Sequence, residues 1–96
     1  MTTTTFHPRV PIPAGATADD WPSITVDGVP VRSLTCSEHD TAKVGVSVCG
    51  LQFGDDGRYS REIMLFGGDG ATLDAADARA LAAKLLEAAE SLDSLP

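Results

Sequence analysis

Thiol and imidazole groups are the most chemically specific side chains in this sequence. Cys36 and His39 form a Cys-x-x-His spacing in a polar stretch, and Cys49 follows later in the chain. Thiolate and imidazole are common zinc ligands, and a loop can present two of them to one ion. A structural zinc site normally uses four protein ligands, and only one Cys/His pair is closely spaced here. We therefore expect no cofactor, and a small zinc-stabilised domain that uses Cys36 and His39 is kept as an alternative.

The N-terminal residues and the cysteine content indicate a compartment. The first residues contain no apolar stretch of the kind that secretory signals carry. No apolar run approaches the ~18 residues that span a bilayer. We expect a cytoplasmic protein that does not contact membranes. A bridge between Cys36 and Cys49 would stabilise the fold by ~2–3 kcal/mol, but a reducing cytoplasm favours free thiols.

Two segments have the residue types of catalytic motifs without their spacing. Ser37, His39 and Asp40 are the residue types of a hydrolase triad, but neighbours in one loop do not normally adopt triad geometry. Gly67–Gly70 precedes a helical pattern, as phosphate-binding loops do, yet the Lys-Ser/Thr of such loops is missing. We interpret residues 67–70 as a connector and predict that the protein is not an enzyme.

The charge balance narrows the classes of partner. The chain has 14 acidic residues against 7 Lys and Arg, which gives a net charge of -7. Such a surface repels the phosphates of nucleic acids and of anionic lipids. The basic residues are scattered, so we expect no direct nucleic-acid binding. Mimicry of nucleic acid by the acidic residues remains a further alternative.

The sequence divides into a tail and one domain. Residues 1–20 are rich in Thr and Pro and predict a flexible or extended tail, and residues 21–96 predict a single α+β domain. Apolar runs at 24–26 and 29–34 flank Asp27–Gly28, which is typical of a type I′ hairpin. Residues 42–53 alternate as a long strand, and residues 58–66 return as its partner. Tight pairing would place Cys49 near Ile63 and Val46 near Phe66.

The C-terminal segment has the clearest periodicity. Residues 73–92 predict an amphipathic helix, with Asp74 as the N-cap and Asp77 at N3. The centre of its apolar face is predicted at Ala78, Leu85 and Ala89. The expected architecture is a four-stranded antiparallel β-meander with this helix packed on one face.

The same helical segment carries a family resemblance. Leu73 and residues 77–90 resemble the C-terminal segment of small uncharacterised proteins from actinobacteria and their phages. These proteins also place a Cys/His loop ahead of a β-meander, as Cys36 and His39 would. The resemblance covers residues 31–92 and implies no activity. A phage or prophage origin would favour a small protein that binds and modulates a host protein.

One helix cannot cover both apolar faces of the predicted hairpin. We therefore predict a non-enzymatic interaction or regulatory module that binds another protein, with a homodimer as a second outcome. The tail could instead cover the open face through Val10, Ile12 and Trp21. The candidate contact residues form two sets, of which the helix should leave one open: Val44, Val46, Val48, Met64 and Phe66, or Leu51, Phe53, Tyr59 and Ile63.

Overall fold

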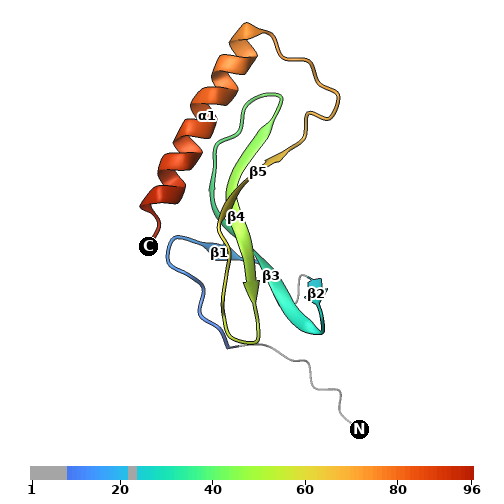
Figure 1. Ribbon diagram of the computed structural model, residues 1–96, viewed down its shortest axis with the longest axis vertical. Helices are drawn as coiled ribbons and strands as arrows, with labels where there is room; N and C mark the ends of the chain where they lie inside the picture. The colour runs from blue at the N-terminus through green and yellow to red at the C-terminus, as the bar shows by residue number, and fades with distance from the viewer. Residues whose placement is uncertain (1–8, 22–23) are drawn as a thin grey trace.

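The computed structural model describes residues 9–21 and 24–96. They form a five-stranded antiparallel sheet and one C-terminal helix, so the α+β class is confirmed (Figure 1). The elements are β1 (Thr17–Ala18), β2 (Ile24–Val26), β3 (Val29–Glu38), β4 (Gly45–Phe53), β5 (Glu62–Phe66) and α1 (Ala75–Ser94). The prediction of four strands was wrong by one, because the short β1 comes from the segment that was assigned to the tail.

Strand β3 is flanked on one side by two short strands and on the other by β4. The sheet order is β1-β3-β4-β5. β2 pairs with the same edge of β3 as β1 does, at the other end of that edge. The turn between β2 and β3 has positive φ at Asp27 (50°) and at Gly28 (79°), as the predicted type I′ turn requires.

The β4–β5 hairpin corrects the predicted register. Cys49 lies opposite Glu62, not Ile63, and Val46 lies opposite Leu65, not Phe66. The cause lies at the turn, where the Phe53 N–H donates to the Arg58 carbonyl at 2.9 Å and fixes the pairing of the whole hairpin. A shift of one residue turns every side chain of β5 to the other face of the sheet.

Helix α1 begins where the sequence predicts. The Asp74 carboxylate accepts the Asp77 N–H at 2.8 Å, and the Asp77 carboxylate accepts the Asp74 N–H at 3.1 Å. Each carboxylate thus satisfies a backbone donor that the first helical turn leaves free.

The buried stripe of α1 differs from the predicted one. Ala88 is fully buried, and Leu81, Leu85 and Leu92 pack with it against Val46 and Val48 of β4. Ala78, a predicted centre of the apolar face, is exposed, and Leu86 is 67% exposed. The small side chain of Ala88 lets the helix axis approach the sheet closely at this point.

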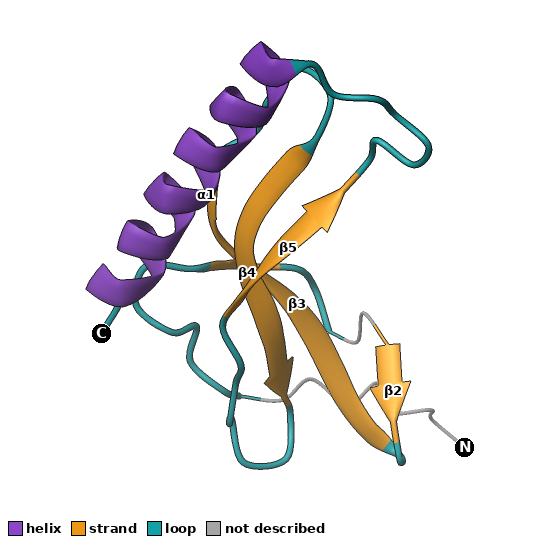
Figure 2. Ribbon diagram, turned by 45° about the horizontal axis from the view of Figure 1, so that its top comes forward, coloured by secondary structure: helices purple, strands orange, loops and turns teal. Residues whose placement is uncertain are grey.

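The two faces of the sheet have different coverings, and we name them accordingly. The helix face holds Val46 and Val48 and lies under α1, and the open face is the opposite side (Figure 2). Among the described residues, the buried hydrophobic side chains are those of Val31, Leu34, Val46, Val48 and Ala88. This core of five residues is small for a domain. Burial of a valine or leucine side chain contributes only about 1.5–3 kcal/mol.

The N-terminal segment covers the part of the helix face that α1 does not reach. Arg32 and Gln52 project from β3 and β4 and are 7% and 1% exposed. The Arg32 guanidinium donates to Gln52 Oε1 (2.6 and 2.9 Å) and to the Val10 carbonyl (2.9 Å). The Trp21 ring lies 4.2 Å from the Arg32 Cζ atom. The described part of the predicted tail is therefore held on the sheet by specific contacts.

Candidate functional site

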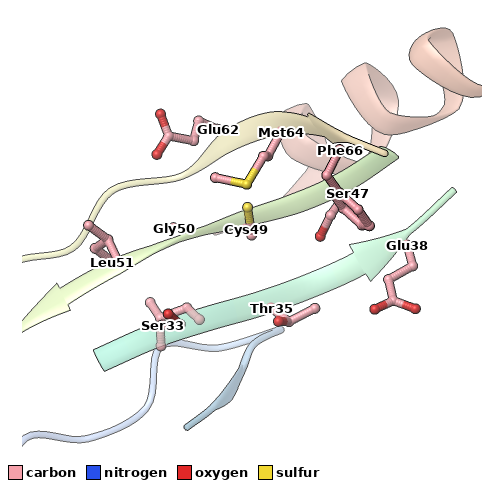
Figure 3. Close-up of a pocket in the computed structure, with 11 residues that line it drawn as sticks. Ser33, Thr35, Glu38, Ser47, Cys49, Gly50, Leu51, Glu62, Met64 and Phe66 are labelled. Carbon is pink, nitrogen blue, oxygen red and sulfur yellow. The ribbon is translucent and has the colours of Figure 1, made fainter. Parts of the chain in front are cut away.

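A groove of about 340 Å³ lies on the open face of the sheet (Figure 3). Period-two alternation brings most of its lining together from three adjacent strands, β3, β4 and β5. The lining residues are Ser33, Leu34, Thr35, Glu38, Ser47, Cys49, Gly50, Leu51, Glu62, Met64 and Phe66.

The groove has an apolar side and a polar side. Met64 and Phe66 of β5, with Leu51 of β4, supply the apolar surface, and hydroxyl groups of β3 and β4 supply the polar surface. The Phe66 ring lies over Gly45, where any added Cβ would collide with it. Glycine at that position therefore lets an aromatic ring rest on the end of β4.

The apolar side is open to solvent. Met64 is 51% exposed and Phe66 is 46% exposed, whereas Val46 and Val48 on the helix face are completely buried. Large apolar side chains that gather in one hollow are a typical feature of binding sites, whereas single exposed apolar residues are common on any surface.

Charge in the groove has one sign. Glu38 and Glu62 are exposed and lie at its rim (Figure 3). No Lys or Arg lines the groove in the part of the chain that the structure describes. The net charge of -7 adds to the negative potential of these two carboxylates.

The candidate contact residues are divided between the two faces. Val46 and Val48 lie beneath α1, while Met64, Phe66 and Leu51 line the groove. This mixture of the two predicted sets follows from the corrected register of β5.

The remaining candidates lie outside the groove. Phe53 lies under the Arg58 guanidinium, with 4.1 Å from Cζ to the ring centre. Tyr59 lies 4.8 Å from Arg61 Cζ, and Val44 is partly buried next to β4.

Ser37 and His39 belong to a separate polar cluster between β3 and α1. Ser37 Oγ is 2.9 Å from His39 Nε2, and His39 Nδ1 is 3.4 Å from Glu87 Oε2. This connectivity is that of a serine–histidine–acid triad. Asp40, the acid suggested by the sequence, instead accepts the Val46 N–H at 2.9 Å. Nothing in the local spacing points to Glu87, which comes from the helix.

The surroundings of this cluster favour a role in positioning α1. Ser37 Oγ is also 2.8 Å from Ser91 Oγ of the helix, so its hydrogen-bonding capacity is shared. Hydrogen bonds from Lys84, and then from His39, lower the pKa of Glu87. The groove lies on the opposite face of the sheet, so no substrate in it would reach Ser37 Oγ. The cluster joins the end of β3 to the helix.

The sheet separates Cys49 from the other two candidate zinc ligands, Cys36 and His39. Cys36 packs against the core on the helix face, and Cys49 lines the groove on the open face. Both thiols are free, and His39 bonds Ser37 and Glu87. Within residues 9–21 and 24–96 there is no group of three or more His, Cys, Asp or Glu arranged to hold a metal ion.

The hydrogen-bond network around Arg32 was not predicted from the sequence. The Gln52 side-chain amide donates to the carbonyls of Pro11 (3.0 Å) and Gly57 (3.3 Å) while its oxygen accepts from Arg32. Burial lowers the pKa of Arg32. The only sequence signal is that an arginine and a glutamine occupy inward positions of two apolar strands.

The same network bears on the alternative in which the tail covers the open face. Val10 and Trp21 contact Arg32 on the helix-face side, and Ile12 is 50% exposed. None of the three lines the groove. The described part of the tail therefore leaves the groove open.

Comparisons with known proteins give no relative from which a function could be transferred. No protein-family model, curated protein or solved structure matches the chain. Among the described residues, no helix is both long enough and apolar enough to cross a membrane.

Proposed function

We propose that the protein is a non-enzymatic interaction module whose groove binds an apolar, basic segment of another protein. The observation that supports this function is the exposure of Met64 (51%) and Phe66 (46%) in one groove. Burial of such side chains by a partner yields about 25 cal/mol per Å² of apolar surface.

The chemistry of the groove defines the partner. Apolar side chains of the segment would contact Met64, Phe66 and Leu51, and methionine adapts its shape to different partners. Lysine or arginine side chains would reach Glu38 and Glu62 at the rim. The net charge of -7 would accelerate the association of a basic partner and repel an acidic one.

The biological setting follows from the family resemblance. If the chain is of phage or prophage origin, the partner is a host protein whose activity the module changes by occupying a basic, apolar surface. A cytoplasmic location is part of this proposal.

Titration with a designed peptide tests the function. The probe is a synthetic peptide of alternating leucine and lysine, added to the ¹⁵N-labelled full chain and followed by NMR. We expect amide shifts in the groove strands, weaker binding at high salt, and at least a tenfold loss of affinity in Leu51→Lys, since a buried unpaired charge costs more than about 1.4 kcal/mol.

Two controls accompany the titration. Leu86→Lys alters a residue that is 67% exposed on the outer side of α1, and it should bind the peptide as the parent does. A leucine–glutamate peptide should not bind. Equal affinity for both peptides, or shifts that map to the outer side of α1, would contradict the proposed function.

A further inference from the structure

Strand β5 forms an edge of the sheet and exposes apolar residues in succession. It pairs with β4 alone within the described part of the chain. Met64, Leu65 and Phe66 are 51%, 52% and 46% exposed, respectively. Natural edge strands are usually protected by lysine, proline, a bulge or a covering segment. The sequence Glu-Ile-Met-Leu-Phe of β5 contains no lysine or proline and pairs with β4 without a register shift.

The other edge of the sheet shows the protection that β5 lacks. There β3 is covered by β1 and β2, and β2 faces a proline, Pro30, in β3. β1 and β2 pair with separate stretches of β3, and between these stretches the Arg32 guanidinium contacts the Trp21 ring. This edge offers no long, regular run of backbone groups to another strand.

The backbone groups on the outer side of β5 can be assigned from the hairpin. The Phe53 N–H donates to the Arg58 carbonyl and the Ser60 N–H donates to the Leu51 carbonyl. Alternation in an antiparallel pair then directs the N–H and C=O of Met64 toward β4. The N–H and C=O groups of Ile63 and Leu65 point away from the sheet. Within the described residues these outward groups have no partner strand.

We propose that β5 pairs with β5 of a second copy of this chain, antiparallel, about a twofold axis at Met64. In this register Ile63 lies opposite Leu65 of the second copy, and the two residues exchange hydrogen bonds in both directions. Every outward group of these two residues is thereby satisfied. The two sheets become continuous across the axis.

The side chains of this edge are complementary to themselves in the same register. Met64 meets Met64 of the second copy on the open face, and Leu65 meets Ile63 on the helix face. Glu62 lies opposite Phe66 and Arg61 opposite Gly67, so no like charges face each other across the new pair. An isologous contact of this kind closes at two copies and exposes no further edge of β5.

A second copy also complements the small core. The described chain has five buried hydrophobic residues, whereas three exposed ones lie together on β5. Pairing would bury part of that surface along the edge and leave the grooves open. The net charge of -7 per chain opposes association through long-range repulsion. The dimer is therefore expected to tighten as salt screens the repulsion. Because the grooves of the two copies would lie on one continuous face, the dimer would present two sites to a partner.

The mass of the full chain in solution is the first test. Sedimentation equilibrium over a range of concentrations should show a monomer–dimer equilibrium that shifts to dimer with added salt. Leu65→Lys places a charge on the edge and should lower the association constant at least tenfold. The matched control Leu86→Lys, also on an exposed leucine, should associate as the parent does. Thermal melts of both variants at dilution verify that each remains folded.

Cross-linking tests the register. With Cys36 and Cys49 replaced by serine, Met64→Cys should form an interchain disulfide readily, since directly opposed Cβ atoms lie about 4.5–5.5 Å apart. Glu62→Cys should not, because its counterpart lies several residues along the strand.

The test also separates this dimer from the peptide-binding function. Leu51→Lys should dimerise normally while losing the peptide, and Leu65→Lys should bind the peptide as a monomer. A parent chain that stays monomeric at every concentration and salt level would overturn the dimer, as would dimerisation of Leu65→Lys at parental strength. Faster cross-linking of Glu62→Cys than of Met64→Cys would overturn the register.

Discussion

The two faces of the sheet differ in how they are completed. On the helix face, Val46 and Val48 are fully buried under α1, and Arg32 is enclosed by the N-terminal segment. On the open face, Met64 and Phe66 remain about half exposed around a groove. In the function that we propose, the helix face stabilises the fold and the open face of the same strands binds the partner. In β4 and β5, substitution of a helix-face residue is expected to lower the stability of the fold. Substitution of a neighbouring open-face residue is expected to weaken partner binding.

The largest effect is expected for a charge on the buried stripe of α1. Leu85→Asp should leave no cooperative unfolding transition, because a carboxylate would replace part of a small core without a cationic partner. Leu86→Asp, one residue along the helix and 67% exposed, is the matched control and should melt like the parent. Circular dichroism against temperature makes the measurement. Parent-like melting of Leu85→Asp would mean that α1 does not close this face.

The next largest loss of stability is expected at the end of the helix face that the N-terminal segment covers. Gln52→Ala removes the acceptor of the buried Arg32 and the donor to the Pro11 carbonyl. The free energy of unfolding should fall by about 2–4 kcal/mol, because a buried cation loses its best partner. Gln52→Glu keeps an acceptor for Arg32 and should lose less. Denaturant unfolding gives both values, and equal stability of parent and Gln52→Ala would show that the network does not hold the N-terminal segment.

A smaller effect is expected at the junction of β3 and α1. Ser37→Ala removes hydrogen bonds to His39 and Ser91 and should cost about 1 kcal/mol. If the cluster positions the helix, a fluorophosphonate reagent will not label Ser37 in the parent chain. Labelling detected by mass spectrometry that disappears in Ser37→Ala would assign nucleophilic chemistry to this serine.

The smallest effect lies at the exposed start of α1. A hydrogen bond from Lys43, and then one from the Asp74 N–H, lowers the pKa of Asp77. A carboxylate whose pKa is lower in the folded state stabilises the fold at neutral pH, and this stabilisation is lost as the pH falls through the folded-state pKa. Lys43→Met should therefore melt slightly below the parent at neutral pH, and the two should converge in acid. A difference that persists in acid would assign the effect to something other than this ion pair.

Local signals in the sequence predicted the elements well. Asp27–Gly28 predicted a turn because both positions adopt positive φ, and Asp74 predicted the helix start because its carboxylate caps nearby N–H groups. These features depend on a few consecutive residues. The α+β class follows from such elements and their order.

Features that depend on the choice of hydrogen-bond partner, across a turn or far along the chain, were predicted less well. The register of β5 turned on the pairing of Phe53 with Arg58, and a slip of one residue exchanged the faces of Met64 and Ile63. The partner of His39 is Glu87, far along the chain, whereas the acidic neighbour Asp40 accepts the Val46 N–H. The groove combines Met64 and Phe66 of one predicted contact set with Leu51 of the other, because the register of β5 decides which side chains share a face.

Methyl accessibility in the dilute full chain tests the central contrast most directly. A soluble paramagnetic agent broadens NMR signals in proportion to exposure, so the Met64 methyl should be strongly broadened while the methyls of Val46 and Val48 stay sharp. Equal protection of Met64 and Val48 at concentrations where the chain is monomeric would contradict the account, because the open face would then be part of the core.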